Sequence, residues 1–210
     1  MNGVILAFEN AMEQAAQPPE PEIVSRTVQR GAGLLTDYIV YGAAIGGLFG
    51  LVFALAYGRS NGFDPKALSA LLALAGFVAM VLVPELKYPA SPPAIGVPET
   101  IGARTALYFA MFAISLLAMT LAATLAPPLA ARLGPWNGAL VSAAVFVAVA
   151  ALAALALPPV DEVPGNFPAS VLWNFRLPSV GARAVLWAAL GPTFGGITQI
   201  WLAGGKPGRS

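Results

Sequence analysis

Two carboxylates, Glu85 and Glu99, flank a short proline-rich segment and are the side chains best suited to contact a metal cation. Oxygen ligands bind divalent cations weakly and exchangeably, which suits passage of an ion better than its storage. The chain has no histidine and no cysteine, so it lacks the imidazole and thiolate ligands that hold transition metals tightly. Histidine is also the commonest general base, so we predict no enzymatic activity and no tightly bound cofactor. The alternative is that both carboxylates are solvated loop charges.

Two arginines lie four residues after an expected helix N-cap. Arg104 follows Thr100, and Arg183 follows Ser179. A cation near the positive end of a helix dipole is unfavourable. We therefore expect each guanidinium to be held by a carboxylate or by a lipid phosphate. The candidate carboxylates are Glu99 and Asp161. The alternative is simple anchoring of the arginines at the lipid headgroups.

The two arginines belong to an internal repeat. At an offset of 79 positions, YPAS at residues 88–91 recurs as FPAS at 167–170, and TIGAR at 100–104 recurs as SVGAR at 179–183. Repeats of helical hairpins are common in membrane transport proteins. Two crossings separate equivalent helices, so we expect parallel repeats, residues 67–126 and 138–203, that superpose by rotation about the membrane normal.

Pro168 in the second copy of the repeated segment matches Pro89 in the first. Four prolines stiffen the loop that begins with the first copy: Pro89, Pro92, Pro93 and Pro98. They remove backbone donors and leave carbonyls that point outward, so a rigid loop of this kind can coordinate a cation; the alternative is a structural lid. We expect the two copies to meet over the mouth of the helix bundle and to form one cluster from these residues: Lys87, Tyr88, Glu99, Arg104, Phe167, Arg176 and Arg183.

The composition predicts the elements that position these residues. Hydrophobic residues make up 58% of the chain and charged residues 10%, which is typical of an integral membrane protein, and the formal net charge of +1 gives no basis for binding nucleic acid. Charge-free stretches can hold crossings of about 20 residues, which predicts an all-α polytopic membrane protein. The five expected crossings are residues 36–57, 67–84, 103–126, 138–157 and 181–203. Three of them are expected to end at prolines: Pro84, Pro127-Pro128 and Pro158-Pro159.

The loops predict the orientation. Short basic connections with few acids lie on the same side as the C-terminus, which places that end in the cytoplasm. Residues 1–35 then form an extracytoplasmic segment, acidic and proline-rich, and residues 36–210 form the helix bundle. Asp37 opens the first expected crossing at the membrane boundary, either as a functional carboxylate or as an interfacial residue.

Two segments carry a family resemblance: PELKYPASPPAIGVPETIGARTALYFAM at residues 84–111 and NFPASVLWNFR at residues 166–176. They resemble the CbtA family of proposed cobalt transporter subunits. The resemblance implies an inner-membrane protein of six crossings, linked to acquisition of cobalt (Co2+) for cobalamin, which works beside a small single-span companion with a His-rich tail. The family's first crossing is absent here, and Ser91 stands where Asn is usual. We therefore expect a further crossing upstream of Met1; the alternative is a genuine extracytoplasmic start.

Two classes of function stay open at this point. The first is a transport subunit in the lipid bilayer that admits a divalent metal while a His-bearing partner captures it. The second is a non-transporting membrane scaffold or assembly factor. The chain has no ATP-binding motif, so any transport is passive, ion-coupled or powered by another chain. The sequence leaves open whether the chain also self-associates.

Overall fold

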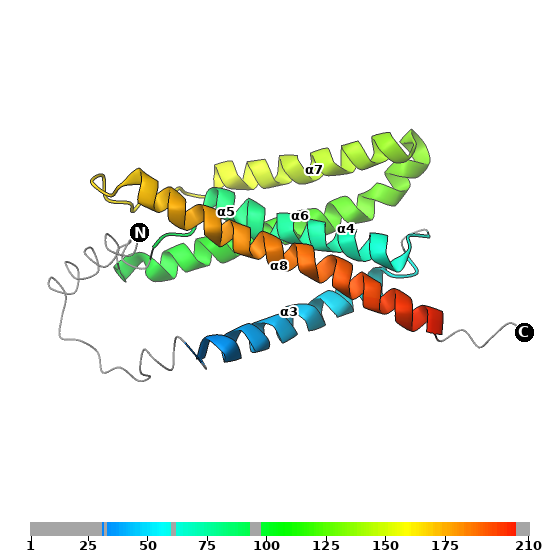
Figure 1. The fold of residues 1–210 in the computed structure, drawn as a ribbon. Coiled ribbons are helices and arrows are strands. Elements are labelled where there is room, and N and C mark those ends of the chain that lie inside the picture. Colours follow the sequence, from blue (N-terminus) through cyan, green and yellow to red (C-terminus); the bar gives the residue numbers. More distant parts are fainter. Residues whose placement is uncertain (1–30, 32, 60–61, 93–97, 205–210) are drawn as a thin grey trace, which may run out of the picture. The chain divides into compact units, whose positions relative to one another are not determined.

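The structure of the protein, a computed structural model, describes residues 31, 33–59, 62–92 and 98–204. Every regular element in these residues is helical (Figure 1). The elements in chain order are α3 (Leu34–Ala56), α4 (Pro65–Phe77), the π-helix η2 (Val78–Leu82), α5 (Val83–Lys87), the 3-10 helix η3 (Pro98–Thr100), α6 (Ile101–Leu133), α7 (Pro135–Ala156) and α8 (Ala169–Gly204). The predicted all-α membrane class is confirmed.

Four helical spans in the described residues are long and apolar enough to cross a membrane: Ile39–Ala56, Pro65–Lys87, Ile101–Leu133 and Pro135–Ala156. They correspond to the first four predicted crossings, although the second and third extend beyond their predicted ends. The fifth predicted crossing, residues 181–203, lies within α8, which carries polar residues such as Thr193 and Gln199 and is not among those four. That crossing stays a prediction.

Three predicted helix boundaries are wrong. Helical backbone continues through Pro84 as far as Lys87, and α6 continues through Pro127 and Pro128 as far as Leu133. A proline removes one or two backbone hydrogen bonds, whereas ending the helix in apolar surroundings leaves more groups unpaired. Ser179 is not an N-cap, since it lies inside α8.

Two boundary predictions fare better. Thr100 directly precedes α6, although its side chain makes no capping hydrogen bond. The fourth predicted helix ends as expected, because α7 stops at Ala156, just before Pro158 and Pro159.

The described chain divides into two compact units, and α4 and α8 contribute to both. In the unit of residues 73–187, α6 and α7 run side by side as an antiparallel hairpin (Figure 1). Gly134 makes the turn with a positive φ of 84°, a conformation that favours glycine. Ala118, Ala122 and Phe146 form the buried centre of this hairpin. Small residues let the two backbones approach closely, as is common between membrane helices.

Glycines allow close contacts between elements in this unit. At Gly138, a Cβ atom would lie 2.6 Å from the Cα atom of Ala130, so α7 presses its backbone directly against α6. At Gly76, a Cβ atom would overlap the ring of Trp187, so the glycine leaves the space that the indole fills. A larger side chain at Gly138 would push α7 away from α6, and one at Gly76 would displace Trp187 from α4.

The second unit contains α3, the first part of α4 and the last part of α8. Ser69 is fully buried and donates a hydrogen bond from its hydroxyl to the carbonyl oxygen of Gly191 at 2.6 Å. Gly195 allows α8 to lie against α4, since a Cβ atom there would be 2.8 Å from the Cα atom of Lys66. Phe194 packs edge-on against Phe49, with ring centroids 5.2 Å apart.

Candidate functional site

A π-helical turn and a proline place the first candidate carboxylate. In η2 the helix widens, and the N–H of Val83 bonds to the carbonyl oxygen of Val78, five residues back. Pro84 follows, has no N–H to donate and is fully buried. The next residue, Glu85, is then turned inward and is buried, whereas Leu86 is exposed. Insertions of this kind in helices frequently occur at functional sites.

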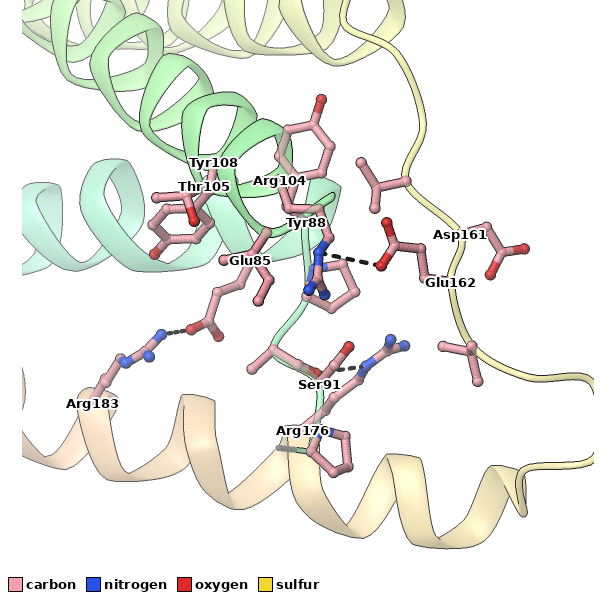
Figure 2. Close-up of a pocket in the computed structure, with 16 residues that line it drawn as sticks. Glu85, Tyr88, Ser91, Arg104, Thr105, Tyr108, Asp161, Glu162, Arg176 and Arg183 are labelled. Atoms are coloured by element: carbon pink, nitrogen blue, oxygen red, sulfur yellow. Dashed lines mark hydrogen bonds and ion pairs between the residues drawn. The ribbon is translucent and has the colours of Figure 1, made fainter. Parts of the chain in front are cut away.

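The residues after α5 and three other segments of the same unit enclose a pocket of about 510 Å³ (Figure 2). One wall is the irregular segment from Tyr88 to Pro92. The first two turns of α6, the connection after α7 and the first four turns of α8 form the other walls. Six charged side chains line it, three acidic and three basic: Glu85, Asp161, Glu162, Arg104, Arg176 and Arg183. Among the described residues, the pocket is therefore balanced in formal charge.

One ion pair lies at the inner end of the pocket, where the guanidinium of Arg183 contacts the carboxylate of Glu85. The Glu85 side chain is only 5% exposed, whereas that of Arg183 is 42% exposed. Neither carboxylate oxygen of Glu85 accepts a conventional hydrogen bond from the described residues. A buried carboxylate is costly unless it is compensated, so Arg183 supplies the charge that makes burial of Glu85 tolerable.

A second ion pair joins α6 to the connection between α7 and α8. Nε of Arg104 lies 3.2 Å from Oε2 of Glu162, and both side chains are partly buried. Arg104 is the fourth residue of α6, near the positive end of the helix dipole. The carboxylate of Glu162 offsets that unfavourable position. A carboxylate partner was expected there, but the expected candidates were Glu99 and Asp161.

Two hydrogen bonds hold the irregular segment in place. The hydroxyl of Tyr88 donates to the carbonyl oxygen of Pro158 at 2.8 Å, and Nε of Arg176 donates to the carbonyl oxygen of Ala90 at 3.1 Å. Burial raises the pKa of the Tyr88 phenol above its ordinary value of 10.0, so it stays protonated and remains a donor at neutral pH. The segment is thus tied both to the end of α7 and to α8.

The pocket collects four of the seven residues of the predicted cluster: Tyr88, Arg104, Arg176 and Arg183. It also contains three other predicted site residues, Glu85, Pro89 and Pro92. Others lie outside its lining. Lys87 sits beside it, with Nζ 5.7 Å from the ring centroid of Tyr88, and Glu99 is an exposed residue of η3. Pro93 and the side chain of Asp37 fall outside the part of the chain that the structure describes.

The two copies of the repeated segment do not share one conformation. Tyr88 and the three residues after it stay irregular, whereas Ala169 and Ser170 already form the first turn of α8. The difference follows from the next residues: two prolines come after the first copy, and helix-compatible residues come after the second. Phe167 is buried and Pro168 precedes the helix, so neither reaches the pocket lining. The expectation of two equivalent loops is therefore wrong.

The partners of the arginines were only partly foreseen. Both are held by carboxylates, but Arg104 pairs with Glu162 rather than with Glu99 or Asp161. Ser91, Thr105 and Tyr108 also line the pocket and were not predicted. The sequence does place two adjacent acids at positions 161 and 162. In an irregular segment either of two neighbours can face the pocket, so Glu162 was as suitable a partner for Arg104 as Asp161.

The described residues hold no group of three or more histidine, cysteine, aspartate or glutamate side chains close enough to bind a metal ion. A cation in the pocket would meet the carboxylate of Glu85 together with carbonyl and hydroxyl oxygens. Such a donor set is weak for transition metals, which prefer nitrogen and sulfur ligands.

Comparison with known families identifies a family to which the chain is similar. The model of the family described as "Probable cobalt transporter subunit (CbtA)" matches residues 6–199, nearly the whole chain. No curated protein and no solved structure matches the chain. The membrane-spanning helices agree with a transporter subunit, and the extent of the family match includes every residue of the pocket. The chain therefore belongs to the CbtA family of probable cobalt transporter subunits.

Proposed function

We propose that this chain is the membrane subunit of a cobalt uptake system that supports cobalamin synthesis, and that its pocket is where the cation first contacts the subunit. The observation that carries the proposal is Glu85, a buried carboxylate at the end of an apolar helix whose charge is compensated by a partly exposed arginine. Ionisable residues at membrane depth are costly and mark pathways for ions. A transporter subunit is not a class of enzyme, and no catalytic step is required of this site.

Exchange of counter-ions explains how the site would work. A unit charge 4 Å from a carboxylate is attracted by about 4 kcal/mol at an effective dielectric constant of 20, and a divalent ion by roughly twice that. A divalent cation can therefore displace Arg183 from Glu85, although loss of its hydration shell offsets much of the gain. Because Arg183 is 42% exposed, its guanidinium can turn to solvent when displaced. The result is a weak, reversible contact, as passage requires.

Selectivity then has to come from another chain. This protein contains no histidine and no cysteine, and oxygen ligands discriminate poorly among divalent transition metals. We propose a small single-span companion with a His-rich tail as the capturing partner, acting in the inner membrane with the C-terminus of this chain in the cytoplasm. Glu99, exposed on η3, is the second proposed contact for the arriving cation. Asp37 at the start of α3 is a further candidate.

Uptake of cobalt at limiting supply tests the proposal. Cells that depend on this chain should accumulate less Co2+ when they carry Glu85→Gln, with a smaller loss for Glu99→Gln, while the amount of protein in the membrane stays unchanged. Asp64→Asn is the matched control. Asp64 accepts the N–H of Ala67 at the start of α4, and asparagine removes the charge while still capping the helix.

Two outcomes would contradict the proposal. If Glu85→Gln cells accumulate cobalt as the parent does at every concentration, Glu85 is not a contact for the cation. If deletion of the whole chain leaves uptake unchanged, the protein is a membrane scaffold or assembly factor.

A further inference from the structure

Arg176 differs from the other two arginines of the pocket. Arg183 pairs with Glu85 and Arg104 pairs with Glu162, but no carboxylate of the described residues pairs with Arg176. Its one hydrogen bond there is the donation from Nε to the carbonyl oxygen of Ala90, which is neutral. A guanidinium carries five N–H donors, so four stay available.

The position of Arg176 suits its remaining N–H donors to bind a ligand. The side chain is part-buried, so its charge is not fully solvated. In Figure 2 the guanidinium of Arg176, from α8, and that of Arg104, from α6, both lie within the pocket, while the carboxylate of Asp161 points away from Arg176. Planar guanidinium groups bind carboxylate and phosphate oxygens in pairs of parallel hydrogen bonds. The free donors of the pocket thus match an oxyanion rather than a bare cation.

The volume of the pocket points the same way. A divalent ion with six waters occupies about 180 Å³, at the roughly 30 Å³ per molecule of liquid water. The pocket holds about 510 Å³, within the range of sites for small organic ligands. Its three acidic and three basic side chains balance, so an occupant that carries both a cation and an anion disturbs the balance least.

We infer that the pocket binds an oxyanion, a carboxylate or phosphate group, on the free N–H donors of Arg176 with help from Arg104. Resting on the proposed function, the inference extends to the substrate: the metal reaches Glu85 as a complex with a carboxylate-bearing chelator, whose spare oxygens bind Arg176. The chelator then replaces part of the hydration shell that the cation loses. The anion site itself does not depend on transport.

Binding of citrate to the purified full chain tests the anion site without any metal. In nanodiscs of zwitterionic lipid, the parent should bind citrate measurably by calorimetry. Arg176→Gln should weaken binding at least tenfold, and Arg176→Lys should weaken it less, because a lysine keeps the charge but loses the paired geometry. Arg132→Gln, an exposed arginine in the last turn of α6, is the matched control and should bind as the parent does.

A second arm separates a free oxyanion from a lipid headgroup. Native mass spectrometry of the same variants with phosphatidylglycerol measures retained anionic lipid. If Arg176→Gln abolishes citrate binding, the oxyanion is a small molecule. If Arg176→Gln loses only its retained lipid, the oxyanion is the phosphate of a lipid headgroup. If Arg176→Gln and Arg176→Lys, with unchanged unfolding temperatures, bind citrate and lipid as the parent does, the inference is wrong.

Uptake measurements keep the inference and the proposed function apart. Arg176→Gln cells should lose uptake of cobalt supplied as its citrate complex several-fold more than uptake of free Co2+. Citrate binding without any cobalt uptake by the parent would overturn the proposed function and leave the anion site standing. Equal loss of both forms of cobalt would overturn the chelate as substrate.

Discussion

The pair formed by Glu85 and Arg183 makes an asymmetric prediction about stability. Loss of one partner from a buried ion pair costs about 3–5 kcal/mol, because the other charge stays buried without compensation. Here the Glu85 side chain is 5% exposed and Arg183 is 42% exposed. Arg183→Gln strands a buried carboxylate, so we expect it to cost about 2–4 kcal/mol, after a discount for the exposed partner. Glu85→Gln leaves an arginine that can turn to solvent, so we expect about 1 kcal/mol.

A double-mutant cycle measures this asymmetry. The parent, both single variants and the Glu85→Gln/Arg183→Gln double variant are unfolded thermally in one detergent, and the double variant should be more stable than Arg183→Gln alone. The interaction free energy from the cycle should be roughly 1–2 kcal/mol, within the range found for residues in contact. Additive costs, or a larger cost for Glu85→Gln than for Arg183→Gln, would refute the reasoning that Arg183 compensates a buried carboxylate.

Two other predictions concern the surroundings of the pocket and the helix hairpin. Burial raises the pKa of Tyr88 above 10.0, so the stability that the protonated phenol contributes is complete below pH 10 and is lost as the pH rises through the raised pKa. Tyr88→Phe should cost about 1 kcal/mol at pH 7, because it removes the hydrogen bond to Pro158. Thermal unfolding measured as a function of pH would contradict this prediction if the variant and the parent lost stability equally in alkali. Gly138→Ala should destabilise the hairpin by about 1–3 kcal/mol, because the Cβ of the new alanine would lie 2.6 Å from the Cα of Ala130. Gly102→Ala is the control: its Cβ would meet nothing within 4 Å, so this variant should stabilise α6 by up to about 1 kcal/mol. Equal unfolding temperatures for the two variants would show that α6 and α7 are not closely packed at Gly138.

The sequence was sufficient for the class of fold because the relevant signal is local and strong. A stretch of about 20 apolar residues without charge has few stable alternatives to a membrane helix. The ends of the helices were harder to predict from the sequence. Proline pairs predict an end in water, but α6 runs through Pro127 and Pro128, because in apolar surroundings the rest of the helix keeps its hydrogen bonds only by continuing.

The site was predictable in part for the same reason. Arg104 and Arg183 are cations placed near expected helix starts, so a need for carboxylate partners could be inferred from each position alone. The identity of the partner could not, because it depends on the path of the irregular segment after α7. Glu162 rather than its neighbour Asp161 meets Arg104, and no periodic pattern in the sequence distinguishes the two. Nor does any local pattern predict the π-helical turn that directs Glu85 inward.

These details bear on how a protein without strong metal ligands can serve metal transport. A site that binds a cation tightly would hold it, and an unpaired buried carboxylate would be too costly to maintain. In the mechanism that we propose, the pocket avoids both difficulties, since Arg183 compensates the charge of Glu85 and is displaced when a cation arrives. In the same proposal, the N–H donors of Arg176 that no described residue accepts bind the negative charge of a chelated metal. Each charge that enters then meets an opposite charge already present, so the cost of bringing the complex to the edge of the apolar helices is reduced without strong binding.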